Sequence, residues 1–234
     1  MAAPAKSRKK KENLFKSTDL NKLKSNIQLK PKQYDLSKEI KSNIFTIVSG
    51  PAGTSKTWTT CYTALELLAN NKINEIIITK PLIESSYSMG FLPGSLEEKI
   101  EPYMKSYIST FVKMIGNEKF QELRINEVIK IETLNFMRGE TYDNSILLLD
   151  EGQNLQMKDL MLWITRLGES SKAVLMGDIS QYDIKETESN FKSFRDIMRD
   201  VPDVHIFEFE REDIVRNPFL VDITDRYEKW KANK

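Results

Sequence analysis

One segment, residues 50–57, constrains the fold of this chain more than any other part of it. The segment reads GPAGTSKT; an apolar run precedes it at 44–48, and a helical pattern follows it at 58–68. A glycine-rich loop that joins a strand to Lys-Thr at a helix start is the context that a phosphate-binding loop, G-x-x-x-x-G-K-[ST], requires. Glycines let backbone N–H groups turn towards an anion, and the helix N-terminus adds partial positive charge. The segment therefore predicts a nucleotide site, and a glycine turn before an ordinary helix is the weaker interpretation.

The loop itself is expected to supply most ligands of the phosphates. Lys56 would reach the β- and γ-phosphates of a nucleoside triphosphate, and the Thr57 hydroxyl would ligate Mg²⁺. Backbone N–H groups of the loop would bind other phosphate oxygens. The predicted nucleotide-binding residues of the loop are therefore Gly50, Pro51, Ala52, Gly53, Thr54, Ser55, Lys56 and Thr57.

Ser55 stands where the motif has its second glycine. If this residue has a right-handed conformation, serine fits and only adds a Cβ near the phosphate. If it needs a positive φ, serine costs about 1–2 kcal/mol relative to glycine. The sequence leaves both conformations open.

A second motif carries the acidic residues that such a site needs. The apolar run at 146–149 is typical of a buried strand, and it ends in Asp150 and Glu151. Asp150 is predicted to hold the Mg²⁺ shell, and Glu151 to orient and deprotonate the attacking water. Ligands of open α/β sheets bind outside the carboxyl ends of the strands. We therefore expect four strand ends to meet at one edge, which brings together residues 50–57, 79–80, 150–151 and 177–178.

Two further residues are candidates for catalysis. Gln181, in the segment 177–183, is placed to sense the γ-phosphate just past a strand, although this segment alone is also an ordinary turn. Arg216, in the segment 213–218, is placed where a helix starts. An arginine supplied to the γ-phosphate stabilises charge in the transition state. The competing interpretation of Arg216 is a surface arginine.

Apolar strands alternate with helical patterns along the chain, and this predicts a mostly parallel sheet flanked by helices. Strands are expected at 44–49, 75–80, 128–131, 146–149, 173–176 and 205–209. Helices are expected at 36–40, 56–70, 95–116, 157–167, 189–199 and 212–230. The predicted fold class is α/β.

Charge is distributed unevenly between the amino-terminal segment and the rest. Residues 1–32 carry ten Lys or Arg against two acidic residues, a net charge of +8, so that the total of +1 leaves −7 for the remainder. Residues 1 to about 28 lack a sustained apolar period, and we predict a basic, disordered arm over 1–29 and one domain over 30–234. The arm either binds a polyanion or is a solvated terminus.

The chain has no apolar run long enough to span a membrane and no secretory signal. It has one cysteine, Cys61, which we expect to be a packed core thiol.

In combination these motifs resemble the PhoH-like proteins, the phosphate-starvation-type ATPases of bacteria and their phages. The resemblance covers residues 30 to about 230. It rests on GPAGTSKT (50–57), TKP (79–81), GFLPG (90–94), FMRGET (136–141), LLLDEGQN (147–154), ITRLG (164–168), GDISQYD (177–183) and DIVRNP (213–218). The chain departs from the family pattern at Ser55, Glu140, Gly152 and Asn217. Of these, only Ser55 touches the predicted chemistry.

The resemblance implies a RecA-like P-loop NTPase core close to the first motor domain of superfamily 1 helicases. It implies ATP and Mg²⁺ as ligands, with Gln33 near the adenine. It also implies a role linked to single-stranded RNA or DNA, in the cytoplasm of a bacterium or a phage-infected host. Because superfamily 1 motors use two RecA-like domains, we expect a homo-oligomer, such as a hexameric ring, whose ATP site is completed by Arg138, Arg166 or Arg216.

Three functions remain open on the sequence. The first is an ATPase that acts on single-stranded nucleic acid, which would bind along residues 79–80, 87–94 and 136–139. The second is a nucleotide-dependent regulatory or nucleic-acid-binding protein that hydrolyses ATP slowly or not at all. The third is a small-molecule kinase, which has little use for the Asp150-Glu151 pair. An alternative for Phe91 and Leu92 is that they contact a neighbouring subunit.

Overall fold

The computed structural model describes residues 14–81, 100–178 and 190–215, together with Phe219, Asp222, Ile223, Arg226 and Trp230. Its centre is a six-stranded sheet in the order β3-β2-β4-β5-β1-β6, and every pair of neighbouring strands is parallel. The strands are β1 (Phe45–Ser49), β2 (Glu75–Thr79), β3 (Ile129–Glu132), β4 (Ser145–Leu149), β5 (Lys172–Gly177) and β6 (Val204–Glu208). The predicted α/β class with a parallel sheet is confirmed.

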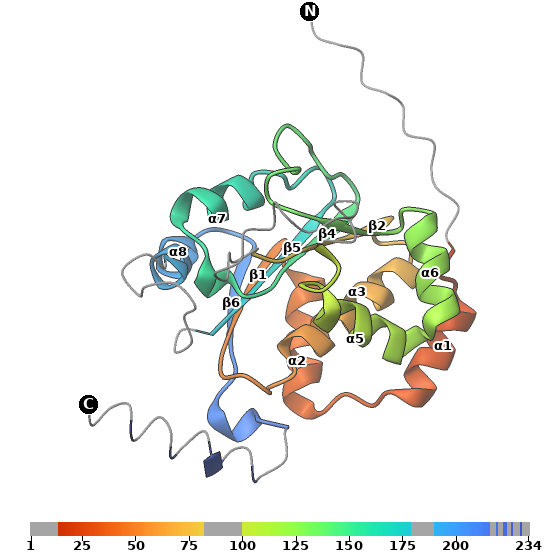
Figure 1. Ribbon diagram of the computed structural model, residues 1–234, viewed down its shortest axis with the longest axis horizontal. Helices are drawn as coiled ribbons and strands as arrows, with labels where there is room; N and C mark the ends of the chain where they lie inside the picture. The colour runs from red at the N-terminus through yellow and green to blue at the C-terminus, as the bar shows by residue number, and fades with distance from the viewer. Residues whose placement is uncertain are drawn as a thin grey trace, which may run out of the picture.

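Helices cover both faces of the sheet (Figure 1). One face carries α1 (Ser17–Asn26), α2 (Pro31–Ser42), α3 (Lys56–Ala69), α5 (Lys105–Ile115) and α6 (Asn117–Ile125). The other face carries α7 (Met157–Ile164) and α8 (Phe191–Met198). Within the described ranges, the short 3-10 helices η2 (Gly152–Asn154) and η4 (Arg211–Asp213) follow β4 and β6.

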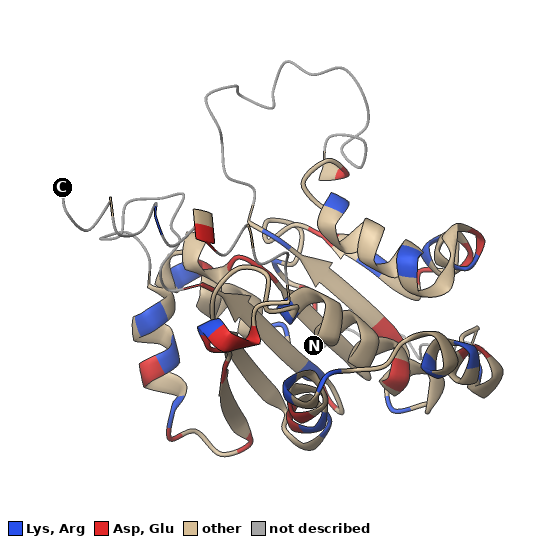
Figure 2. Cartoon of the chain, turned by 90° about the horizontal axis from the view of Figure 1, so that it is seen from below, with Lys and Arg blue, Asp and Glu red and all other residues tan. Residues whose placement is uncertain are grey.

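The period of two along each strand divides the core into two layers. On β4, Ile146 and Leu148 pack against the α3 side, whereas Leu147 and Leu149 pack against α7 and α8. Charged side chains gather on the helices, and the strands between them carry few (Figure 2). Continuous apolar runs at β1, β2 and β4 are therefore what a sheet buried on both faces requires.

The prediction of a disordered arm over residues 1–29 is wrong for its described part, residues 14–29. Phe15, Leu20 and Leu23 are buried, and α1 packs against α3 and α5. These three apolar side chains anchor α1 and the residues just before it, although the segment is rich in lysine, because all three are buried in the core. Residues 1–13 lie outside the described part of the chain.

Other boundaries differ from the sequence prediction at particular helices. The second helix begins at Pro31 and not near Leu36, because proline at the first helical position is pre-set for a helix start. Of the helix expected over 95–116, Ile100 is helical, residues 101–104 form a turn, and α5 begins at Lys105. The helix α6 was not expected. Of the helix expected over 212–230, the start lies in η4 and Ile214 is extended, and the other residues up to 230 lie mostly outside the described part. The residues described there, Phe219, Asp222, Ile223, Arg226 and Trp230, are helical.

The topology places four strand ends side by side at one edge of the sheet. The strand β5 lies between β1, which leads into the glycine loop, and β4, which ends before Asp150. In the pairing of β2 with β4, Thr79 lies opposite Leu149, so that Lys80 follows beside Asp150. Within the described residues, no helix is both long and apolar enough to cross a bilayer.

Candidate nucleotide-binding site

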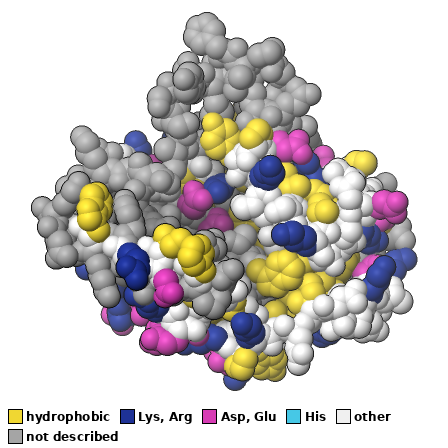
Figure 3. Space-filling view, turned by 60° about the horizontal axis from the view of Figure 1, so that its bottom comes forward, with side chains coloured by type: hydrophobic (Ala, Val, Ile, Leu, Met, Phe, Trp, Pro, Cys, Tyr) yellow, Lys and Arg dark blue, Asp and Glu magenta, His cyan; other side chains and the backbone are white. Residues whose placement is uncertain are grey.

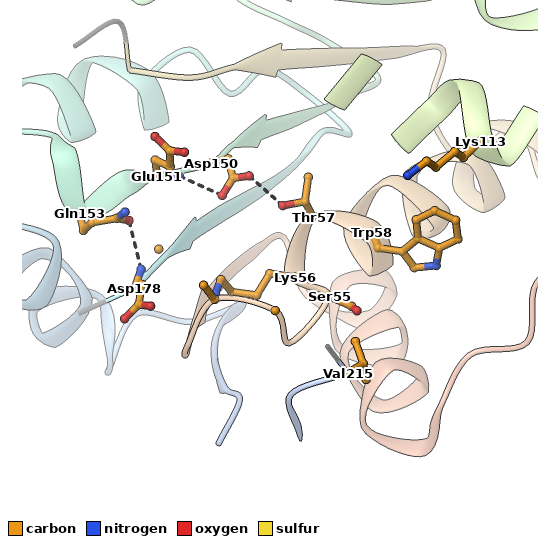
Figure 4. Close-up of a pocket in the computed structure, with 13 residues that line it drawn as sticks. Ser55, Lys56, Thr57, Trp58, Lys113, Asp150, Glu151, Gln153, Asp178 and Val215 are labelled. Atoms are coloured by element: carbon orange, nitrogen blue, oxygen red, sulfur yellow. Dashed lines mark hydrogen bonds between the residues drawn. The ribbon is translucent and has the colours of Figure 1, made fainter. Parts of the chain in front are cut away.

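A cavity of about 600 Å³ opens at this edge of the sheet. It is lined by the glycine loop, the start of α3, the acidic pair after β4 and the end of β5 (Figure 4). Acidic and basic side chains lie close together beside a hollow in the space-filling view (Figure 3). The structure therefore brings the two predicted halves of the site together.

The loop has the backbone conformations that its glycines permit. Gly50 has φ of 141°, and a Cβ built there would lie 2.5 Å from the carbonyl oxygen of Phe209. Gly53 also has a positive φ, of 90°. Ser55 is left-handed, with φ of 66° and ψ of 29°, at the N-cap of α3. Of the two conformations left open by the sequence, the structure therefore has the strained one.

The first turn of α3 is suited to an anion. The helical hydrogen bonds begin with Thr59 N donating to Ser55 O at 2.9 Å. The N–H groups of a first helical turn have no acceptor within the helix, and the helix dipole adds positive charge there. A phosphate at this turn would therefore meet backbone donors and a favourable field.

The side chain of Lys56 folds back over the loop. Its Nζ donates to the carbonyl oxygens of Gly50 and Pro51, at 2.5 and 2.9 Å. Thr54 Oγ1 donates to the same Pro51 oxygen at 2.9 Å, which stiffens the turn. A phosphate group at the loop would give the Lys56 ammonium a charged partner in place of these carbonyls.

Thr57 and Asp150 form a direct contact between the two halves of the site. Thr57 Oγ1 donates to Asp150 Oδ2 at 2.8 Å, and Asp150 Oδ1 accepts from Glu151 N at 2.9 Å. A hydroxyl and a carboxylate are the hard oxygen donors that Mg²⁺ prefers, usually completed by substrate phosphates and water. The described residues contain no cluster of three His, Cys, Asp or Glu for a metal. The donor set thus fits Mg²⁺ bound together with a phosphate.

Glu151 lies next to this contact in an unusual backbone conformation. Its φ is 57° and its ψ is 39°, in the left-handed region, which non-glycine residues rarely adopt. Glu151 Oε1 lies 2.6 Å from the Nζ atom of Lys80, and Lys80 is the first residue after β2. The sequence placed both residues at the same edge but gave no sign of this ion pair.

Several cavity residues were not predicted from the sequence. Gln153 Oε1 accepts from Asp178 N at 3.1 Å, which ties η2 to the end of β5. Val215 N donates to Gly53 O at 3.0 Å, which ties the segment after η4 to the glycine loop. Trp58 and Lys113 line the cavity from α3 and α5. A motif search misses such residues because only the packing of distant segments brings them to the cavity.

Three further predicted site residues are Gln33, Gln181 and Arg216. Gln33 is buried at the start of α2, where its Oε1 accepts from Lys30 N at 2.9 Å, and it is not among the lining residues. A contact between Gln33 and adenine therefore stays a prediction. Gln181 and Arg216 lie outside the described residues.

Two buried acidic groups near the site are held in their neutral forms. Burial raises the pKa of the Cys61 thiol well above its ordinary value, and the nearby charge of Asp150 raises it further. Burial, with a smaller contribution from Asp150, likewise raises the pKa of Tyr107. Cys61 is fully buried, which agrees with its predicted role as a packed core thiol.

Comparisons with known proteins agree with the motifs. The model of the family described as PhoH-like protein matches residues 27–228. The chain is 34% identical over 191 residues to a PhoH-like protein of Bacillus subtilis (strain 168), covering 81% of this chain and 60% of that protein. It is 33% identical over 183 residues to Protein PhoH of Escherichia coli (strain K12), covering 77% of this chain and 52% of that protein. The chain thus spans little more than half the length of these relatives.

A solved structure, the Hef helicase domain of Pyrococcus furiosus, is also similar. It matches 80% of this chain and 40% of its own length, with 11% sequence identity and a TM-score of 0.49.

Proposed function

Because the chain belongs to the PhoH-like protein family, we propose that it hydrolyses ATP with Mg²⁺ and couples this reaction to single-stranded RNA or DNA in a homo-oligomer. The observation that carries the proposal is the hydrogen bond of 2.8 Å from Thr57 Oγ1 to Asp150 Oδ2, in the cavity next to the glycine loop. It joins the hydroxyl and the carboxylate that a magnesium-dependent phosphate site needs. Both hydrolysis and coupling to a nucleic acid strand depend on the binding of a nucleotide at this loop.

The loop and the first turn of α3 would bind the phosphates. Lys56 exchanges its contacts with Gly50 O and Pro51 O for the β- and γ-phosphate oxygens. Thr57 and Asp150 would hold Mg²⁺, which supplies positive charge that neutralises the phosphate oxygens. Trp58 and Lys113 border the part of the cavity next to the start of α3.

Hydrolysis requires a water molecule in line with the bond to be broken. The water oxygen forms a bond to the γ-phosphorus, the bond from that phosphorus to the β–γ bridging oxygen breaks, and ADP leaves. The water proton passes to the Glu151 carboxylate, which acts as the general base. Lys56 stabilises the developing charge, and we assign Gln181 to sensing the γ-phosphate and Arg216 to further charge stabilisation.

Arginines from a second copy of the chain are proposed to complete the site. The structure describes two of the candidate arginines, Arg138 and Arg166. The Arg166 side chain already binds carbonyl oxygens of its own chain, since it donates to Leu162 O and Glu140 O, both at 3.2 Å. Arg138 is exposed beside Phe136, whose side chain is 56% exposed. Arg138 is therefore the better of these two for contact with a partner or a nucleic acid strand.

A second function keeps nucleotide binding but has slow or no hydrolysis. The left-handed Ser55 and the pairing of Glu151 with Lys80 favour it, because both alter groups that hydrolysis needs. A measurement of ATP turnover with Mg²⁺, with and without single-stranded RNA, separates the two. Turnover that RNA stimulates supports the ATPase, whereas Mg·ATP binding without turnover supports the regulatory protein.

A further inference from the structure

The ion pair between Lys80 and Glu151 involves the residue proposed as the general base. Lys80 Nζ lies 2.6 Å from Glu151 Oε1, with 16% of the Lys80 side chain and 34% of the Glu151 side chain exposed. The pairing of β2 with β4 brings Lys80 and Glu151 together, because Thr79 lies opposite Leu149 and Asp150 N donates to Thr79 O at 3.3 Å. Lys80 therefore reaches Glu151 from the neighbouring strand end.

The pair holds Glu151 away from the place where it would act. In Figure 4 the Glu151 carboxylate points away from Lys56 and the glycine loop. A general base needs one oxygen within about 2.6–3.2 Å of the proton that it takes. An ammonium group at one carboxylate oxygen fixes the side chain and competes with water for that oxygen.

The surface around Lys80 suits a single nucleic acid strand. Thr79 Oγ1 contacts Met137 Sδ at 3.4 Å, so the segment 136–139 lies against the end of β2. This segment presents Phe136, 56% exposed, and the exposed Arg138. An aromatic ring for base stacking with cations for the phosphates is the pattern of sites that bind single strands.

We propose that Lys80 is a positioning residue that keeps Glu151 withdrawn, and that a backbone phosphate of a single strand releases Glu151 by pairing with Lys80. A phosphate is a suitable competitor because lysine binds it as a point charge. The partly exposed pair is open to this exchange. The inference rests on the proposed ATPase function and deepens it, since one lysine links strand binding to the base.

The test is steady-state turnover of Mg·ATP, with and without poly(U), by the wild-type chain and its Lys80 variants. Lys80→Ala is expected to raise kcat without RNA several-fold, within the roughly 10²-fold that a positioned base contributes at its lower limit. The KM for ATP should be unchanged, because Lys80 is not among the residues lining the cavity. Stimulation by poly(U) should fall to about onefold in this variant, since the release has already occurred.

Four control variants separate a loss of positioning from general damage to the fold. Lys80→Arg keeps the charge and should behave like wild type, whereas Lys80→Gln should behave like Lys80→Ala and covers the case in which the alanine variant folds poorly. The double variant Lys80→Ala/Glu151→Gln should be as slow as Glu151→Gln alone, because the increase must pass through Glu151. Lys38→Ala, at an exposed site on α2, should leave both rates unchanged.

The opposite results overturn the inference in distinguishable ways. If wild type is stimulated by poly(U) and Lys80→Ala has an unchanged or lower basal kcat, Lys80 does not restrain Glu151, and the ATPase proposal stands. If the wild type shows no ATP turnover and Lys80→Ala does, the restraint of Glu151 by Lys80 is supported. If neither protein hydrolyses ATP with or without poly(U), the restraint and the ATPase proposal both fall.

Discussion

Thr57 and Asp150 are 93 residues apart in the chain, yet the Thr57 hydroxyl donates a hydrogen bond of 2.8 Å to the Asp150 carboxylate. Thr57 lies in the first turn of α3, which follows β1 and the glycine loop, and Asp150 follows β4. The strand β5 lies between β1 and β4. The contact needs both strand ends at one edge of a parallel sheet. It sets the place where a metal ion and a phosphate would meet.

The first prediction concerns nucleotide binding. Lys56→Ala should abolish tight ATP binding without unfolding the protein, because the Lys56 ammonium lies at the cavity and outside the hydrophobic core. Thermal unfolding with and without Mg·ATP measures this, and Lys38→Ala is the matched control. A thermal shift by Mg·ATP that survives in Lys56→Ala would remove Lys56 from the phosphate site.

The second prediction uses the conformation of Ser55. Ser55→Gly should raise the free energy of unfolding by up to about 1–2 kcal/mol, because glycine adopts a φ of 66° without the Cβ penalty. Some of this gain is offset by the greater freedom of glycine in the unfolded chain. ATP turnover should be retained or raised, since the backbone N–H remains. Urea unfolding and a turnover assay check both, and a large loss of activity would show that the serine hydroxyl has a role of its own.

The third prediction is a pH dependence at the contact of α1 and α2 with α3. Lys24 Nζ and Lys41 Nζ each lie 2.8 Å from an oxygen of Glu66. Burial alone would raise the pKa of Glu66, but hydrogen bonds from Lys24 and Lys41 outweigh it and lower the pKa below its ordinary value. Since the folded pKa is lowered, the stabilisation is present above the unfolded glutamate pKa, about 4.3, and is lost as the pH falls through the folded value.

Glu66→Gln should therefore lower the free energy of unfolding at neutral pH by about 1 kcal/mol, the sum for two partly exposed ion pairs. The difference from wild type should shrink at pH values below about 4.3. Urea midpoints of both proteins at pH 7 and at pH 3.5 measure this. A difference that is the same at both pH values would contradict the ionic account of this contact.

The fourth prediction concerns the basic amino-terminal segment. Deletion of residues 1–13, which removes Lys6, Arg8 and three lysines at 9–11, should weaken binding of single-stranded RNA without lowering the unfolding temperature. The salt slope should fall by about 0.7 for each RNA phosphate that these cations neutralise. Deletion of residues 1–29 should destabilise the protein as well, since burial of each of Phe15, Leu20 and Leu23 contributes about 1.5–3 kcal/mol.

RNA titrations at two salt concentrations and thermal unfolding separate these effects. Unchanged affinity and salt slope after the shorter deletion would identify residues 1–13 as a solvated terminus. Unchanged unfolding temperature after the longer deletion would contradict the packing of α1.

The sequence predicted the elements whose signals are local. Apolar runs ending at Ser49, Thr79 and Leu149 are read directly as buried strands, and their parallel order brings the glycine loop and the acidic pair to one edge. The sequence did not reveal the left-handed φ of Ser55, because the surrounding fold imposes it. It also missed α1, whose few apolar side chains stabilise it only by packing against α3 and α5.

The ion pair of Lys80 with Glu151 was beyond a sequence-based prediction for another reason. It depends on the register of β2 with β4, in which Thr79 lies opposite Leu149. A shift of that pairing along the strands would place another residue beside Glu151. Motifs identify the chemical groups of the site, whereas the packing of the sheet decides which groups contact one another.

The most direct test of the account compares wild type with Glu151→Gln, measuring Mg·ATP binding and, with saturating poly(U) present, ATP turnover in the same preparations. The variant should keep the thermal shift by Mg·ATP, because Thr57 and Asp150 are intact, and should lose hydrolysis by about 10²–10⁴-fold, since only the base is removed. Asp150→Asn should instead weaken the dependence on Mg²⁺ itself. Equal turnover by wild type and Glu151→Gln would contradict the assignment of Glu151 as the base.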